Sequence, residues 1–368
     1  MCTTINGAAQ SFSSGSDGTH GALNVTSNTV LTLPPDGIFH FTSINIPSGQ
    51  TLSFTKNALN TPVYLLAQSN ITVGGVIDVS GQSSNGRMAG VGGPGGFDGG
   101  FGPFQGASVG DGQGPGGGKW GGAVAGNGQG GIYATAISGN TNTYGNTLLS
   151  PLIGGSGGSG FGGGQSVGGG GGGGAILIAS STRVTISGRV DALGAPGCAA
   201  GSGGAIRIVA PVIDGSGTLR PLGGGNNCAG PSYYNGGDGR SRIDSIDRFA
   251  HRNLTLLGRG TRGSRMFVFP PGNPRLDIIN AAGTPISEGT NVPASISLPV
   301  GSPTNQIVRV QARGFTEDVL ISVKITPENA PSATFNALIL QSSGTPPFAD
   351  VQVTLPLDTV CYIHAWTR

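Results

Sequence analysis

Charged side chains are scarce in this chain of 368 residues, because Asp, Glu, Lys and Arg make up only 10% of it. Typical soluble domains carry about 25%. The formal net charge of +2 argues against a strongly charged partner, so we expect no nucleic-acid partner. No apolar run approaches the roughly 18 residues of a membrane-spanning helix, so we expect no membrane span.

A secretory leader is also missing from the first residues. Residues 1–9 have neither the basic start nor the apolar stretch of a signal peptide. Two explanations stay open: the chain is numbered from its mature end, or it is not exported by that route. Residues 1–21 are rich in Ser, Thr and Gly, which is typical of a flexible arm. A neighbouring subunit is one candidate for holding this arm, through the segment Cys2, Thr3, Thr4 and Ile5.

Cysteine is rare, with four residues and no Cys-x-x-Cys pair or Cys/His cluster. This usage favours disulfides over zinc, and hence an oxidising, extracellular setting. Cys198 and Cys228 each follow the end of a repeat by four residues, so we expect them to pair. Cys2 and Cys361 lie near opposite ends of the chain. They would join the arm to the last strand, either within one molecule or across two.

Glycine is the residue in excess, at 72 positions, and 39 of these lie in residues 82–174. This insertion ends in seven consecutive glycines, residues 168–174. We expect extended, polyproline-II-like runs that pair with each other, with the rest of the chain or with another subunit. The aromatic residues between the glycines are candidate anchors: Phe97, Phe101, Phe104, Trp120, Tyr133 and Phe161. The alternative is a mobile surface loop.

A pattern of three short strands occurs three times, in residues 63–81, 175–194 and 205–224. Each copy predicts one rung of a parallel β-solenoid, because a single rung cannot bury its apolar side chains unless copies stack. The side chains expected to point inward are Tyr64, Leu66, Ile176, Ile178, Ile206 and Ile208. At one shared corner, Gly74, Gly188 and Gly217 are expected to supply a positive φ.

From Pro270 onward glycine nearly disappears and short strand-like segments recur. They are residues 275–280, 292–298, 306–313, 319–326, 334–340, 351–355 and 359–366. This spacing predicts an immunoglobulin-like β-sandwich. Val308, Val310 and Ala312 would face one side of it, and Arg309, Gln311 and Arg313 the other. The whole chain is therefore predicted to be all-β: an arm (1–21), a glycine-rich parallel β-helix (22–268, with the insertion 82–174) and a sandwich (269–368).

Candidate chemistry is sparse. Asp78 and Asp191 occupy the same position in two repeats, and paired carboxylates can act as acid and base or hold a cation. The third repeat has Arg220 there, however, and the repeats alone explain the pair. The seven arginines between Arg240 and Arg265 indicate either a polyanion patch or an end cap, and we favour the cap because no aromatic stacking pattern interleaves them. We expect no catalytic, cofactor-binding or metal-binding residues and no enzyme activity.

Several motifs carry a resemblance. They are the glycine run followed by Ala-Ile-Leu-Ile-Ala (175–179), Gly-Ser-Gly-Gly-Ala-Ile-Arg-Ile-Val-Ala-Pro (201–211) and Gly-Asp-Gly-Arg-Ser-Arg-Ile-Asp (237–244). Over residues 23–367 the chain resembles uncharacterised glycine-rich, β-helical surface proteins of environmental bacteria, which end in a small sandwich with Leu-Pro strands, here at Leu298 and Leu355. The resemblance implies an architecture, an extracellular or cell-surface location and self-assembly. It transfers no catalytic residue.

Two functional hypotheses follow. The first is an extracellular structural protein that assembles with itself into a fibre or surface layer. The alternative is a polysaccharide-binding adhesin, or a β-helix polysaccharide lyase or hydrolase, that uses Asp78 and Asp191 on the flank of the solenoid.

Overall fold

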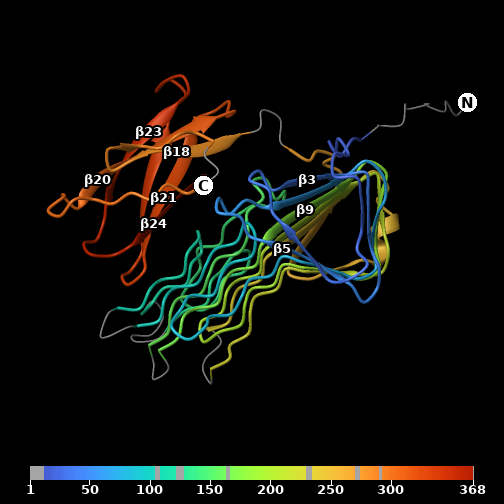
Figure 1. The fold of residues 1–368 in the computed structure, drawn as a ribbon, viewed down its shortest axis with the longest axis horizontal. Helices are drawn as coiled ribbons and strands as arrows, with labels where there is room; N and C mark the ends of the chain where they lie inside the picture. The colour runs from blue at the N-terminus through green and yellow to red at the C-terminus, as the bar shows by residue number, and fades with distance from the viewer. Residues whose placement is uncertain are drawn as a thin grey trace, which may run out of the picture.

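A computed structural model of the chain describes residues 12–103, 108–121, 128–162, 166–228, 234–269, 274–289 and 292–367. The described chain is all-β, as predicted, with parallel sheets in its first part and antiparallel sheets at its C-terminus (Figure 1). A short 3-10 helix, η2 (Ala250–Asn253), interrupts the strands. No helix in these ranges has the length and apolarity to cross a bilayer.

Three parallel sheets, here called A, B and C, stack strands that are far apart in the sequence. Sheet A runs in the order β1 (Ala22–Asn24), β4 (Ser43–Ile46), β7 (Ile71–Val73), β10 (Arg183–Ile186) and β13 (Val212–Asp214). Sheet B consists of β2 (Thr29–Thr32), β5 (Thr51–Thr55), β8 (Val76–Asp78), β11 (Arg189–Asp191), β14 (Thr218–Arg220) and β16 (Thr255–Leu256). Sheet C consists of β3 (Ile38–Phe41), β6 (Val63–Ala67), β9 (Ala175–Ser180), β12 (Ala205–Ala210), β15 (Arg240–Ser245) and β17 (Arg259–Gly263).

The chain visits sheets A, B and C in turn, so each pass forms one rung of a coil. Strands β1, β2 and β3 make the first rung, and η2, β16 and β17 make the sixth, with η2 beside β13 at the end of sheet A. Ile206 lies opposite Ile176, and Ile208 opposite Ile178, in neighbouring rungs. The predicted alignment of these two repeats is therefore confirmed.

The apolar column inside the coil is built from side chains at every second position, but the prediction for β6 was wrong. Val63 and Leu65 of this strand point into the column. Leu66 points outward, and Tyr64 packs with it against a second apolar cluster on the far face of sheet C. Sheet C is covered on both faces, so apolar residues occupy both sides of β6 and alternation alone does not identify the inner one.

The predicted positive φ at the shared glycine corner was also wrong. Gly74, Gly188 and Gly217 all have negative or extended φ, and it is Gly215 nearby that has a φ of +109°. Glycine is needed at the corner because successive rungs approach closely there. A Cβ on Gly188 would overlap the carbonyl oxygen of Gly75, and one on Gly217 would overlap that of Gly188.

The C-terminal part contains two antiparallel sheets. One has the order β19 (Thr284–Pro285), β18 (Arg275–Ala281), β20 (Asn305–Arg313) and β23 (Phe348–Thr354); the other has the order β22 (Ala333–Ile339), β21 (Val319–Pro327) and β24 (Cys361–Thr367). They enclose one core, which includes Val308, Val310 and Ala312. Arg309, Gln311 and Arg313 bind polar partners on the opposite face of β20, as predicted. Residues 292–298 form no strand, whereas β19 pairs with β18.

The described part of the N-terminal arm is held by its own chain. The Ser14 hydroxyl donates to the carbonyl oxygen of Ala67 at 2.7 Å, and the Ser16 hydroxyl donates to that of Phe41 at 2.7 Å. Ser14 also accepts and donates hydrogen bonds at Ser181, directly after β9. The arm therefore binds the first three rungs of its own coil. The predicted assembly segment, Cys2, Thr3, Thr4 and Ile5, lies outside the described residues.

Candidate functional site

The glycine-rich segments all leave the coil at one corner, where the chain passes from sheet B to sheet C. In the third, fourth and fifth rungs these connections are residues 79–174, 192–204 and 221–239. They run out side by side from the coil (Figure 1), and together we call them the glycine slab. The long insertion thus widens one corner without interrupting the stack, since β8 and β11 still pair directly.

The backbone of residues 168–174 binds several neighbouring segments at once. Its N–H groups donate to three segments in rotation, and every third N–H returns to the same one. Gly168, Gly171 and Gly174 donate to Gly86, Gln82 and Val79; Gly169 and Gly172 to Gly100 and Phe97; and Gly170 and Gly173 to Ala199 and Ser202, all at distances between 2.7 and 3.1 Å. A helix with three residues per turn and no internal hydrogen bonds has this property. The run is therefore polyproline-II-like, as predicted.

The segments of the slab are too close for side chains between them. A Cβ on Gly170 would lie 2.5 Å from the carbonyl oxygen of Ala195, and one on Gly174 would lie 2.6 Å from that of Pro94. Of the predicted anchors, Phe97, Tyr133 and Phe161 are buried, Phe101 and Trp120 are half-buried, and Phe104 lies outside the described residues. The glycine run is thus a packed interior with anchored edges.

A disulfide joins two arms of the slab that come from successive rungs. Cys198 lies in the fourth-rung connection and Cys228 in the fifth, and their Cα atoms are 4.9 Å apart. This is the pairing expected from their equal offsets. Cys361 begins β24 and forms no disulfide within the described part of the chain, while Cys2 lies outside it.

Asp78 and Asp191 do stack in adjacent rungs, directly opposite each other. The carboxylate of Asp191 is nevertheless paired with arginines. It accepts two hydrogen bonds from the Arg220 guanidinium at 2.7 Å and one from Arg189 at 2.9 Å. Asp78 accepts the backbone N–H of Ser80 at 2.9 Å. Asp191 thus forms an ion pair with Arg220 of the next rung. Asp78 and Asp191 therefore do not form a free pair of carboxylates for catalysis or cation binding. Within the described ranges, no group of three or more His, Cys, Asp or Glu side chains is placed to hold a metal ion.

The two ends of the coil are where its apolar column is incompletely covered. At the first rung, Leu23 and Leu31 are only half-buried, and β1 and β2 are edge strands. At the sixth rung, Leu256 is half-buried, and Phe249, which directly precedes η2, is 68% exposed. Both ends therefore combine uncovered core residues with strand edges that lack a further partner within the described chain.

The two ends also differ in the sign of their charge. At the sixth rung, four exposed arginines form no ion pair with any described carboxylate: Arg248, Arg252, Arg259 and Arg262. The Arg252 guanidinium instead lies 4.4 Å from the centre of the Phe249 ring. At the first rung, Asp17 and Asp36 are exposed. The backbone N–H of Thr19, which donates to Asp17, holds the pKa of this carboxyl below its usual value.

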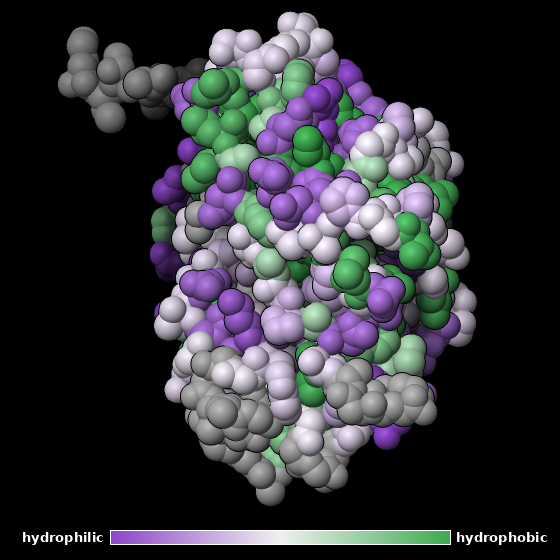
Figure 2. Space-filling model, turned by 90° about the vertical axis from the view of Figure 1, so that its left-hand side faces the viewer, coloured by the Kyte–Doolittle hydropathy of each residue, from purple (hydrophilic) through white to green (hydrophobic). Residues whose placement is uncertain are grey.

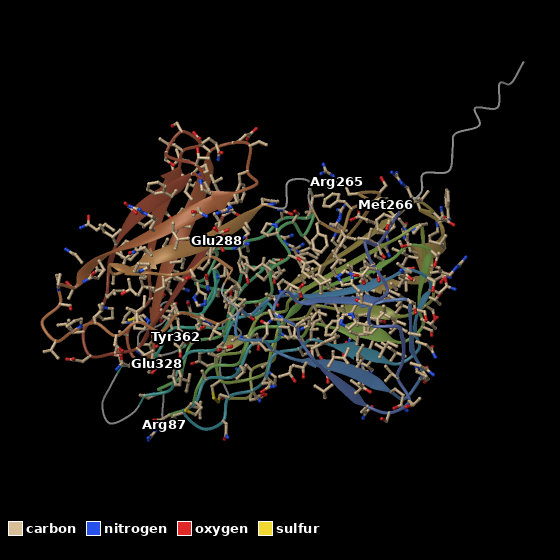
Figure 3. All side chains as sticks on the ribbon, turned by 45° about the horizontal axis from the view of Figure 1, so that its top comes forward. Arg87, Arg265, Met266, Glu288, Glu328 and Tyr362 are labelled. Carbon is tan, nitrogen blue, oxygen red and sulfur yellow. A yellow bond between two sulfur atoms is a disulfide. The ribbon has the colours of Figure 1, made fainter. Side chains whose placement is uncertain are left out.

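A polar seam joins the C-terminal strands to the glycine slab. The Lys324 ammonium on β21 donates to the carbonyl oxygen of Gly114, and Asp111 of the slab accepts both the N–H and the hydroxyl of Ser332 at 2.9 Å. Burial lowers the pKa of Lys324 to about 8. Tyr362 and Glu328, whose side chains are 2.9 Å apart, lie along the same edge of the C-terminal strands (Figure 3).

His364 of β24 lies half-buried in this seam, in register with Lys324. Its ring meets the Phe97 ring of the slab edge to face, with 5.6 Å between the ring centres. Burial, followed by the charges of Lys324 and Lys56, lowers the pKa of His364 to about 4. The imidazole is therefore neutral at physiological pH, and the seam carries no second buried positive charge.

Comparisons with known proteins add nothing to this geometry. No protein-family model, no curated protein and no solved structure matches the chain. Functional inference therefore rests on the coil ends, the slab and the C-terminal sheets themselves.

Proposed function

We propose that this chain is an extracellular structural subunit that assembles end to end into a fibre. In this proposal the coil is a β-solenoid and the C-terminal sheets form an immunoglobulin-like sandwich, as the resemblance to glycine-rich bacterial surface proteins implies. The observation that carries the proposal is the incomplete cover of the apolar column at both ends, by Leu23 and Leu31 at the first rung and by Leu256 at the sixth.

Stacking a second copy on the sixth rung would continue the coil. Strand β16 of one copy would meet β2 of the next, which supplies partners for exposed backbone groups on both edges. Strand β17 would meet β3 through the arm, because His20 and Ser16 already bond to the edge of β3. Burying the half-exposed leucines adds apolar stabilisation of about 25 cal/mol for each Å² removed from water. The contact joins two different surfaces, so it does not close on itself and generates an open filament.

Charge favours one order of stacking. The basic sixth rung, with Arg248, Arg252, Arg259 and Arg262, would face the first rung, where Asp17 and Asp36 are exposed. Two basic ends repel each other, so head-to-tail contact is preferred over tail-to-tail contact. The Cys198–Cys228 disulfide supports an oxidising, extracellular location.

Sedimentation velocity of the purified chain over a wide concentration range tests the proposal. We expect the sedimentation coefficient to rise with concentration, and to rise less at high salt, because exposed charge pairs are screened. Arg259→Glu at the sixth rung should weaken the association. Lys119→Glu, an equal charge change on the slab, should leave it unchanged. A chain that remains monomeric at every concentration contradicts the proposal.

A further inference from the structure

A polar groove of about 450 Å³ lies on the outer face of the four-stranded C-terminal sheet, away from the core. Its walls come from β18, β20, β23 and the turn after β18, and they include Asn280, Gly283, Ile307, Arg309, Asp350 and Gln352. Figure 2 views the molecule from the side of the C-terminal strands, where hydrophilic and apolar side chains intermingle in small patches. The groove is separate from both ends of the coil.

Two departures from regular strand geometry form the groove. The register between β18 and β20 shifts between Ile278 and Asn280, and such a bulge redirects the side chains beside it. The turn that follows has positive φ at both central residues, +48° at Ala282 and +80° at Gly283. Such a turn is tight, and apart from its chain neighbours no atom lies within 4 Å of the position of a Cβ on Gly283, so this side of the groove is open.

The polar groups of the groove are arranged in a row across three strands. Arg309 pairs in register with Asn280 on one side and with Asp350 on the other. The Arg309 guanidinium makes two hydrogen bonds to the Asp350 carboxylate, at 2.6 and 2.7 Å. These opposite charges neutralise each other, so the groove has hydrogen-bonding groups but no net charge.

Two side-chain amides remain open to a ligand. Those of Asn280 and Gln352 have no hydrogen-bond partner in the described parts of the chain, and each amide offers both donors and an acceptor. Ile307 lies between them, in register with Gln352. The side chain of Ile307 is 51% exposed. An exposed apolar side chain framed by free amides suits a ligand that has an apolar face and a hydroxylated rim.

We propose that this groove binds an uncharged polysaccharide. Neighbouring sugar hydroxyls would exchange hydrogen bonds with the Asn280 and Gln352 amides and with the lone pairs of Asp350 that Arg309 does not use. The C–H face of a sugar ring would pack on Ile307. In small-molecule sites apolar side chains commonly supply the contact area, and a few polar groups fix the orientation of the ligand. An anionic ligand is disfavoured because Asp350 already occupies the guanidinium of Arg309.

The test is binding of the full chain to three immobilised neutral polysaccharides, dextran, laminarin and galactomannan, at a concentration where sedimentation shows a monomer. We expect retention on at least one of them, insensitive to salt. The double variant Asn280→Ala/Gln352→Ala should weaken this binding at least tenfold. Its matched control, Asn142→Ala/Gln82→Ala, removes one exposed Asn and one exposed Gln from the slab and should bind like the parent chain.

Three outcomes would overturn the proposal: no retention on any of the three, equal loss in the groove variant and the control, or retention on dextran sulfate alone that salt abolishes. Thermal unfolding of both double variants establishes that they fold. Assembly is measured on the same samples. Since the groove lies away from the coil ends, its variant should assemble normally, and this result separates failure of the groove from failure of the fibre.

Discussion

The ammonium group of Lys324 lies 2.8 Å from the carbonyl oxygen of Gly114. This contact joins a strand of the C-terminal sheet to a backbone of the glycine slab that has few side chains of its own. Together with the contact of His364 on Phe97, it makes the seam a specific interface. The C-terminal strands and the slab should therefore respond together to changes at the seam.

Acid should loosen the seam through His364. The pKa of this imidazole is about 4 in the folded chain, against 6.5 for an ordinary histidine. The unfolded chain therefore binds a proton that the folded chain does not as the pH falls from 6.5 to 4, so the free energy of unfolding decreases over this window, by about 3 kcal/mol at most. His364→Phe keeps the ring packing and should remove this part of the pH dependence. Urea unfolding at pH 7 and pH 4.5 measures it, and identical pH dependence in the two chains would refute the assignment.

The slab should not tolerate a methyl group on its central run. A Cβ on Gly172 would overlap the carbonyl oxygen of Gly155. Gly172→Ala should therefore destabilise the fold by about 1 to 3 kcal/mol, which is typical of overpacking. Gly225 is the matched control, because nothing lies within 4 Å of its Cβ position and its φ is not positive. Gly225→Ala should unfold at the temperature of the parent chain. Equal melting temperatures for the two variants would mean that the slab is not close-packed.

The buried ion cluster on the outer face of sheet C should depend on Asp244. Its carboxylate accepts hydrogen bonds from Arg242 at 2.6 and 2.7 Å, and from Arg207 at 3.3 and 3.4 Å. Asp244→Asn leaves two buried guanidinium groups without a counter-charge and should cost about 3 to 5 kcal/mol. Asp214 pairs with Arg183, and both side chains are more exposed than those of the Asp244 cluster. Asp214→Asn should therefore cost about 1 kcal/mol or less. Chemical denaturation measures both, and similar losses would show that burial does not set the difference.

The disulfide should stabilise the slab by restricting the unfolded chain. Linking Cys198 to Cys228, which are 30 residues apart, corresponds to roughly 3 to 4 kcal/mol in the chain-entropy treatment. The double variant Cys198→Ser/Cys228→Ser should unfold at a lower denaturant concentration. Its free energy of unfolding should be smaller by roughly 3 to 4 kcal/mol. Adding reductant should lower the stability of the parent chain and leave the variant unchanged. A variant as stable as the oxidised parent would contradict this role.

Part of the coil could be read from the sequence because two of its repeats, residues 175–194 and 205–224, keep one length and one apolar pattern. Ile176 and Ile206 align for that reason. The inner face of β6 could not be predicted, since Leu65 and Leu66 are both apolar and both buried. The sequence also did not predict a sixth rung. Its strand β17 has the sequence Arg-Gly-Thr-Arg-Gly, in which apolar and polar residues do not alternate.

The seam and the internal order of the slab left little trace in the sequence. Glycine has no side chain whose pattern could indicate which segments are neighbours, so only the extended conformation was predictable. Lys324 is an ordinary alternating polar residue of a strand until the slab covers it. The open amides of Asn280 and Gln352 likewise form a site only because of the bulge between Ile278 and Asn280. No residue pattern in the sequence predicts this bulge.

Electron microscopy of the native assembly tests end-to-end stacking most directly. Sheets B and C each contain six strands, and a strand spacing of about 4.8 Å gives an axial advance of roughly 29 Å per subunit. We predict filaments whose power spectrum shows this repeat along the axis together with the strand spacing. Monodisperse particles, or filaments whose strands do not run across the axis, would contradict the account.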